Sequence, residues 1–130
     1  MVIDTSALVA IVTDEPERRQ FDAAVAADTR RLLSAASLLE ARIVLLHRSG
    51  PVAIRMLDSF LYHADIEVCP VTPDDSDLAF DAHRRFGKGV HPAGLNFGDC
   101  LAYALAKSTG EPLLFKGGDF TATDLVAVSF

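Results

Sequence analysis

The chain has no tryptophan and only two cysteines among its 130 residues. Cys69 and Cys100 lie far apart and form no CxxC pair, so neither a disulfide framework nor a zinc knuckle is expected. We interpret both as buried thiols in a reducing compartment. Half of the residues are hydrophobic, which at this length is enough for one domain, over residues 1–130, with a core of its own.

Long hydrophobic runs and excess positive charge are also missing. No run approaches the ~18 apolar residues of a membrane span, and the N-terminus lacks the basic start of a signal peptide, so we expect a soluble, cytoplasmic protein. The formal net charge of −6 taken alone argues against nucleic-acid binding. If four carboxylates belonged to a metal site, however, 14 acids would face 12 basic residues. The distribution of charge therefore matters more than its sum.

Short apolar runs alternate with helical patterns along the chain. We expect strands over residues 1–4, 31–35, 66–71, 112–116 and 125–130, and helices over residues 5–12, 15–27, 37–50, 51–64, 75–87 and 97–110. The segment TPDD at 72–75 reads as a turn, and residues 88–96 read as a Gly/Pro-rich loop. This alternation predicts an α/β fold, with five strands in a mainly parallel sheet that helices cover on both faces.

Asp4 directly follows the first expected strand, in the stretch VIDTSAL. Its carboxylate could cap the next helix, but Thr5 and Ser6 could do so equally well and would leave Asp4 free. Sites in open parallel sheets form beyond the carboxyl ends of the strands. A helix cap and one arm of a metal site are therefore both open for Asp4 on local grounds.

Glu40 lies inside an apolar helical stretch. Its neighbours three and four residues on, Ile43 and Val44, are apolar, and burying a lone carboxylate is costly unless it is paired or binds a metal. The alternatives are a position at the edge of the helix or pairing with Arg42 or His47, although neither of these is a favoured helical neighbour. Glu40 is therefore a candidate ligand.

Asp99 stands three residues after Asn96, just ahead of an apolar helix. That spacing suits a capping box, and an acid in a first helical turn is favoured by the helix dipole. Gly98 is a poor helix former at this place, which indicates a close backbone approach. Asp99 can be read as a cap, a ligand, or both.

Asp119 follows the strand at 112–116, where a surface turn is the plain interpretation, and Asp124 competes with it for any role. A parallel sheet can bring Asp4, Glu40, Asp99 and one of these two to one end. Two such charges 4 Å apart repel by about 4 kcal/mol at an effective dielectric of 20. An oxygen-only cluster therefore calls for a hard divalent cation, Mg²⁺ or Mn²⁺, which serves phosphoryl transfer or phosphodiester hydrolysis.

Basic residues gather before Asn96 in the stretch HRRFGKGVHPAGLN. Beside an acidic metal site they are plausible contacts for a polyanionic backbone; a solvated helix end is the alternative. The candidates for binding RNA are Arg84, Arg85, Lys88, His91 and Lys116.

Four blocks of the chain resemble PIN-domain ribonucleases, and among them the VapC toxins of bacterial toxin–antitoxin pairs. The blocks are VIDTSAL, SAASLLEA, HPAGLNFGDCLAYALAK and PLLFKGGDFTATDL, in the order typical of the family. The resemblance implies a Mg²⁺- or Mn²⁺-dependent endoribonuclease with a five-stranded parallel sheet. It also implies a VapB-type antitoxin as the inhibiting partner and a homodimeric toxin.

The same resemblance implies that Asp4, Glu40, Asp99 and Asp119 form the acidic site, and our leading hypothesis makes Asp4 and Asp99 the direct metal ligands. The residue matching Ser6 would help to hold this site, and Asn96 would precede the third acid. Two other functions stay open from the residues alone. One is a phosphoryl-accepting domain of the receiver or haloacid-dehalogenase type, and the other is a non-catalytic module that binds a basic tail of a partner.

Overall fold

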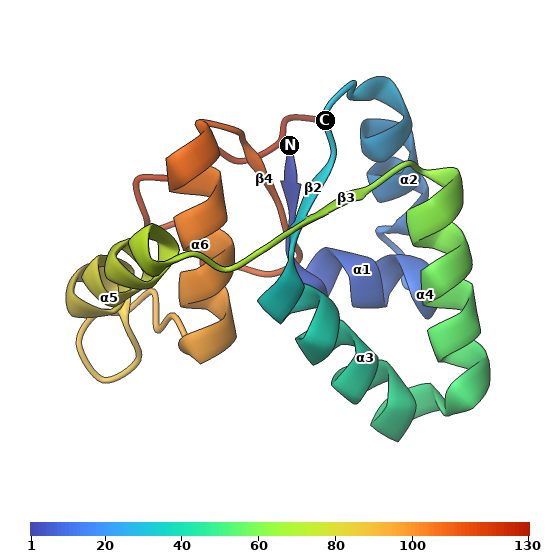
Figure 1. Ribbon diagram of the computed structural model, residues 1–130, viewed down its shortest axis with the longest axis horizontal. Coiled ribbons are helices and arrows are strands. Elements are labelled where there is room, and N and C mark those ends of the chain that lie inside the picture. Colours follow the sequence, from blue (N-terminus) through green and yellow to red (C-terminus); the bar gives the residue numbers. More distant parts are fainter.

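The computed structural model describes all 130 residues as a four-stranded parallel sheet between two groups of helices (Figure 1). The strand order is β3-β2-β1-β4. The strands are β1 (Val2–Ile3), β2 (Leu32–Ser34), β3 (Glu67–Cys69) and β4 (Leu113–Leu114). The helices are α1 (Thr5–Val12), α2 (Arg18–Ala27), α3 (Ala35–Ser49), α4 (Pro51–His63), α5 (Pro73–Phe86) and α6 (Phe97–Thr109).

Strands β1, β2 and β4 divide their side chains between the two faces of the sheet. Val2 pairs in register with Leu32 and Leu113, and all three belong to one apolar core. The next residue of β1, Ile3, pairs with Leu114 and belongs to the other core. Successive strand residues point to opposite faces, so strands of two or three residues are enough to supply both cores.

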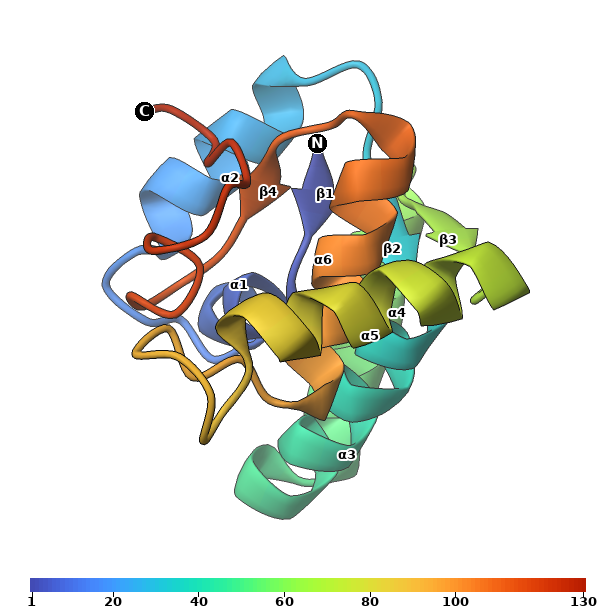
Figure 2. The same ribbon diagram turned by 90° about the vertical axis from the view of Figure 1, so that its left-hand side faces the viewer.

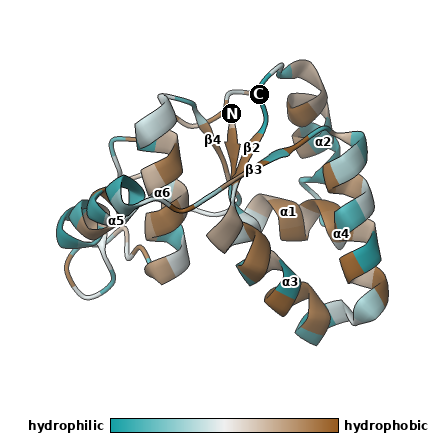
Figure 3. Ribbon diagram, in the orientation of Figure 1, coloured by the Kyte–Doolittle hydropathy of each residue, from teal (hydrophilic) through white to brown (hydrophobic).

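Helices α1, α2, α3 and α4 cover one face of the sheet and α5 and α6 cover the other (Figures 1 and 2). Helix α6 is apolar on nearly all sides, because it lies between the sheet and α5 (Figure 3). Helix α5 presents a polar outer face, as expected for a helix of the outermost layer. No helix is long and apolar enough to cross a membrane.

The expected α/β class is confirmed, but the sheet has four strands and not five. The last expected strand, 125–130, does not form; this segment makes only an isolated bridge, between Leu113 and Ala127. Val126 accepts from the Leu113 N–H and Val128 donates to the Leu113 carbonyl, both at 2.9 Å. The segment touches β4 at a single residue, and Val126 is largely exposed, so a longer strand would bury little.

Three helix starts and one thiol also differ from expectation. Helix α3 begins at Ala35 and not at residue 37, because Ser34 caps it. The TPDD segment is the first turn of α5 and not a turn between elements, because Thr72 and Asp75 form a reciprocal capping box. Helix α2 begins at Arg18 and not at residue 15. Cys100 is buried, but Cys69 is partly exposed, because it lies on the edge strand β3.

Candidate functional site

Asp4 leaves the end of β1 and itself caps α1. Its Oδ2 accepts from the Ser6 N–H at 2.9 Å and from the Ser6 hydroxyl at 2.6 Å. The expectation that Thr5 and Ser6 could cap this helix and leave Asp4 free is therefore wrong. Asp4 is only 3% exposed, so the cap lies buried at the carboxyl end of β1.

Ser6 ties Asp4 to the segment that follows β4. Its hydroxyl, which donates to Asp4, accepts from the backbone N–H of Lys116 at 2.9 Å. The Lys116 side chain is paired with Glu15 and Glu17, ahead of α2. The backbone is thus held at Lys116, three residues before the exposed Asp119.

Glu40 lies on α3, which faces α1 across the same end of the sheet. Its Oε2 accepts from the Thr5 hydroxyl at 3.1 Å, a partner that sequence reasoning missed because Thr5 was considered only as a cap. Neither suggested pair forms; Arg42 pairs instead with Asp58 of α4. A Cβ on Gly98 would overlap the Glu40 carboxylate and lie 2.8 Å from its Cδ. The glycine therefore allows α3 and α6 to approach at this carboxylate.

Asp99 caps α6 together with Asn96. The Asp99 N–H donates to Asn96 Oδ1 at 2.8 Å, and Asp99 Oδ2 accepts from the Asn96 N–H at 3.0 Å. Because α6 precedes β4 as a crossover helix, it runs opposite to the parallel strands. Its N-terminus therefore lies at the strand ends from which Asp4 and Asp119 emerge.

These four carboxylates, of Asp4, Glu40, Asp99 and Asp119, interact with one another and with no cation of the chain. None of them is within ion-pair distance of a lysine, arginine or histidine. Burial is the main cause of a raised pKa at Asp4 and at Glu40, and the charge on Asp4 raises the pKa of Glu40 further. Burial, together with the other three carboxylates, raises the pKa of Asp99 to about 6.

Asp124, the competitor of Asp119, lies in a different environment. Its oxygens accept from the Tyr103 hydroxyl at 2.7 Å, from Lys107 Nζ at 3.0 Å and from Arg85 at 3.3 Å. Its pKa is lowered to about 2, because these hydrogen bonds and nearby cations outweigh burial. Asp119, by contrast, adds its charge to the repulsion at Asp4 and Asp99. The structure thus groups Asp119, and not Asp124, with the other three acids.

The basic residues suggested as RNA contacts do not form one free surface. Arg84 and Arg85 both pair with Asp81, one turn earlier on α5. Lys116 pairs with Glu15, which lies between α1 and α2. Each of these side chains thus has an acidic partner, which reduces its charge as seen by a polyanion.

Lys88 and His91 lie in the loop between α5 and α6. His91 is a partly exposed ring that packs edge-on against Phe86, and its Nδ1 accepts from the Ala93 N–H at 3.0 Å. Lys88 is exposed and makes no salt bridge or side-chain hydrogen bond. It is therefore the one lysine or arginine among the five candidates that keeps an unpaired charge.

The donor chemistry of the acidic cluster fits a hard divalent cation. All four side chains offer carboxylate oxygens, which Mg²⁺ and Mn²⁺ prefer, and a cation would relieve the repulsion between their charges. No three acidic, histidine or cysteine side chains stand close enough to share one ion. The cluster is therefore a group of neighbouring carboxylates and not a preformed metal cage.

The titration of Asp99 is expected to make the free energy of unfolding of the metal-free chain depend on pH. The folded-state pKa of about 6 lies above the ordinary value, so the folded state binds this proton more tightly than the unfolded state does. The stabilisation that results is present below about pH 4 and is lost as pH rises through 6. Denaturant unfolding of wild type and Asp99→Asn in EDTA at pH 5 and pH 7.5 isolates this effect, because asparagine does not titrate. The stability of Asp99→Asn relative to wild type should rise between these pH values, and a constant difference would contradict the prediction.

Comparison with known proteins gives the family. The family model described as "PIN domain" matches residues 1–125. VapC ribonuclease Mb0640 of Mycobacterium bovis is 52% identical over 129 residues, covering 99% of this chain and 98% of that protein. A ribonuclease VapC of Mycolicibacterium smegmatis is 54% identical over 128 residues, covering 98% and 99%. The chain belongs to the VapC ribonucleases of the PIN-domain family.

Solved structures agree with this PIN domain in fold. VapC20 of Mycobacterium tuberculosis, described as a toxin that cleaves the sarcin-ricin loop, superposes with a TM-score of 0.81 at 22% identity, covering 99% of this chain and 98% of that one. VapBC2 of Rickettsia felis, bound to a promoter DNA fragment, gives a TM-score of 0.76 at 12% identity, covering 98% and 96%. The PIN-domain match and the two relatives above 50% identity confirm the family resemblance inferred from the four sequence blocks, and these structures agree in fold.

Proposed function

We propose that this VapC ribonuclease is the toxin of a type II toxin–antitoxin pair and hydrolyses RNA phosphodiester bonds at the cluster of Asp4, Glu40, Asp99 and Asp119, with Mg²⁺ or Mn²⁺ as cofactor. The observation that carries this assignment is the isolation of these four acids. None of them has a cationic partner, and burial together with the charges of neighbouring acids raises the pKa of Asp4, Glu40 and Asp99, whereas Asp124 a few residues on accepts from three donors.

The positions of these residues suggest a separate catalytic role for each of them. Asp4 and Asp99 are each held by a helix cap and would ligate the ion directly. Glu40, held by Thr5, and Asp119 would complete the shell or orient the attacking water. A divalent ion in such a site lowers the pKa of bound water and stabilises the charge that develops on the phosphate. Ser6 and Asn96 would act as positioning residues, since they bond to the ligands and not to the substrate.

The two other functions considered from the residues have less support. A phosphoryl-accepting aspartate of the receiver type leaves Glu40 without a role, although Glu40 is part of the cluster. A module that only binds a basic tail does not require the approach of α3 to α6 that Gly98 permits. Membership of a ribonuclease family favours catalysis over both.

RNA cleavage with the metal varied tests the proposed function. Total RNA should be cut in Mg²⁺ or Mn²⁺, and EDTA should stop the reaction. Asp99→Asn should lose cleavage and bind Mn²⁺ more weakly by calorimetry, while its circular dichroism spectrum stays that of wild type, because asparagine can still accept the Asn96 N–H. Full activity in EDTA or in Asp99→Asn would overturn the assignment. Labelling by a phosphodonor would revive the receiver type, and the absence of both Mn²⁺ binding and cleavage would favour binding alone.

Gly98→Ala is expected to reduce cleavage without weakening the fold. Alanine favours a helix by up to about 1 kcal/mol over glycine, and Glu40 can swing aside to admit the new Cβ. The displaced carboxylate would leave the cluster, at a cost of about 10- to 100-fold in activity or metal affinity. Glu40→Gln is the matched variant. If both changes act through the Glu40 carboxylate, the double variant Gly98→Ala/Glu40→Gln should be no less active than the less active of the two single variants. Losses that simply add would show that Gly98 acts by another route.

The partners proposed are a VapB-type antitoxin, an RNA and a second copy of the chain in a cytoplasmic homodimer. The antitoxin rests on the VapBC complex among the structural relatives. The RNA contacts predicted at Arg84, Arg85, Lys88, His91 and Lys116 stay predictions. Co-expression with the protein of the neighbouring reading frame should yield a complex that no longer cuts RNA. A complex that cuts as fast as the free chain would contradict the antitoxin assignment.

A further inference from the structure

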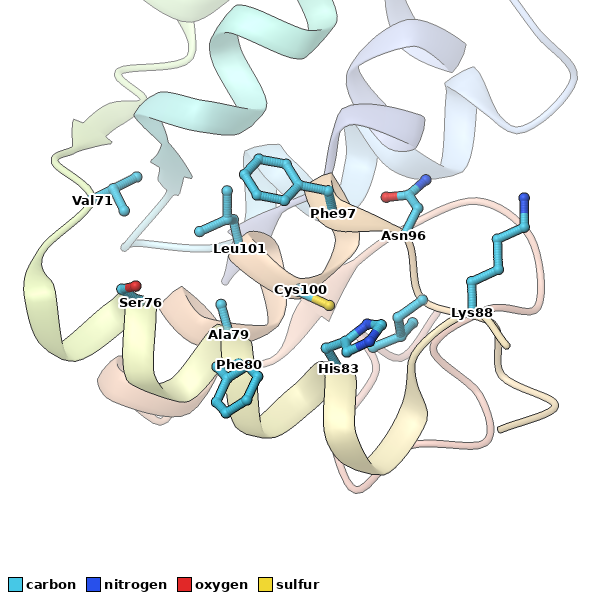
Figure 4. Close-up of a pocket in the computed structure, with 11 residues that line it drawn as sticks. Val71, Ser76, Ala79, Phe80, His83, Lys88, Asn96, Phe97, Cys100 and Leu101 are labelled. Atoms are coloured by element: carbon cyan, nitrogen blue, oxygen red, sulfur yellow. The ribbon is translucent and has the colours of Figure 1, made fainter. Parts of the chain in front are cut away.

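A cavity of about 670 Å³ lies between α5 and α6 (Figure 4). Its walls are mostly apolar and include two aromatic rings, Phe80 and Phe97. These residues are 64% and 84% exposed, so their rings are open to contact from outside the fold. The volume lies in the range of pockets that hold one small organic group, roughly 300–1,000 Å³.

Polar groups gather at one end of this cavity. Lys88 and Asn96 lie on the same side in Figure 4. Lys88 carries a free charge, and Asn96 uses its oxygen to cap α6 while no hydrogen bond occupies its amide nitrogen. The cavity therefore combines an apolar, aromatic interior with a cation and an amide donor at its mouth.

The cavity also adjoins the acidic cluster. A second, shallower groove between α3 and α6 shares Asn96, Phe97 and Leu101 with it and is lined further by Glu40 and Gly98. Phe97 thus separates a hollow that contains a proposed catalytic carboxylate from the aromatic cavity. An RNA strand bound across the carboxylates would therefore need to pass only Phe97, the first residue of α6, to reach the cavity.

We propose that this cavity is a nucleotide subsite, in which an unpaired base of the RNA next to the cut phosphodiester stacks on Phe97 and its phosphate faces Lys88. The proposal rests on the proposed function, because the acidic cluster defines where the RNA lies. Aromatic side chains bind unpaired bases through their faces, and an unpaired lysine suits a phosphate. A purely apolar partner would leave the Lys88 charge without a counterpart, so charge complementarity favours a nucleotide over a second copy of the chain.

Binding measured without cleavage tests the subsite. Fluorescence anisotropy of a labelled unstructured oligoribonucleotide, with Ca²⁺ replacing Mg²⁺ and a gel to show that the oligonucleotide stays intact, is repeated over a salt series. Phe97→Ala should weaken binding about 5- to 100-fold at every salt concentration, and Phe97→Leu should restore little of it. Lys88→Gln should instead lower the slope of log K against log salt by about 0.7. Tyr62→Ala, which removes an aromatic side chain that is 81% exposed on α4, should change neither.

Two further readouts separate the possible failures. A 5-bromouridine oligonucleotide irradiated on the wild-type chain should crosslink to a peptide that contains Phe97 or Phe80. RNA binding that is indifferent to Phe97 and Lys88 would overturn the subsite alone, and no RNA binding by wild type would overturn the proposed function with it. A change of Phe97→Ala from dimer to monomer in light scattering, with unchanged RNA affinity per chain, would assign the cavity to a second copy and overturn the subsite.

Discussion

Asp4→Asn is expected to lose metal-dependent RNA cleavage by about 10³-fold or more while remaining at least as stable as wild type. A metal ion contributes several kcal/mol of transition-state stabilisation, and each 1.36 kcal/mol is worth tenfold in rate. Asparagine keeps an oxygen for the two Ser6 hydrogen bonds and caps a helix about as well as aspartate. It also removes a buried charge whose raised pKa shows that the fold disfavours it.

This combination separates catalysis from folding. Cleavage rates in Mn²⁺ and the urea midpoint of the metal-free protein are the two measurements. Asp75→Asn is the matched control, because Asp75 is likewise buried and caps a helix, α5, through its bond to the Thr72 N–H, but it lies outside the cluster. The control should cut RNA normally. A fully active or unfolded Asp4→Asn would return Asp4 to a purely structural role.

Asp119→Asn and Asp124→Asn are expected to have opposite effects, although the two residues lie in one segment after β4. Asp119→Asn should reduce cleavage about 10- to 100-fold and leave the unfolding temperature unchanged, because Asp119 is exposed and has no partner in the fold. Asp124→Asn should keep its activity and lose about 1 kcal/mol of stability. It weakens bonds to Tyr103, Lys107 and Arg85, and its partial exposure keeps the loss small.

Measuring cleavage and thermal unfolding for both variants gives each a control in the other. The pair is informative because both changes remove one negative charge from the same loop, so a general electrostatic effect on RNA binding would move both alike. Equal losses of activity would contradict the grouping of Asp119 with Asp4 and Asp99. Loss of activity in Asp124→Asn alone would reverse the assignment.

Several elements were predictable because local chemistry decides them. Gly50 and Gly110 end α3 and α6 with positive φ, and the Asn96–Asp99 capping box begins α6 as its spacing indicates. The start of α5 was missed because TPDD reads as a turn and as a helix start alike; only the reciprocal bond between Thr72 and Asp75 distinguishes them. The expected strand 125–130 failed because β propensity cannot form a strand where pairing with β4 is limited to one residue.

The sequence by itself determined the α/β class, the family and the identity of the candidate acids, because periodicity, caps and family motifs are local and lie in order along the chain. Only the tertiary structure decided which of these acids lie close to one another. Asp119 repels Asp4 and Asp99 whereas Asp124 is neutralised by Lys107 and Arg85. It also decided that Lys88 alone keeps a free charge among the suggested basic residues. Both outcomes depend on side chains brought together from distant elements, and the distance between them, which sets their interaction energy, is not encoded in their spacing along the chain.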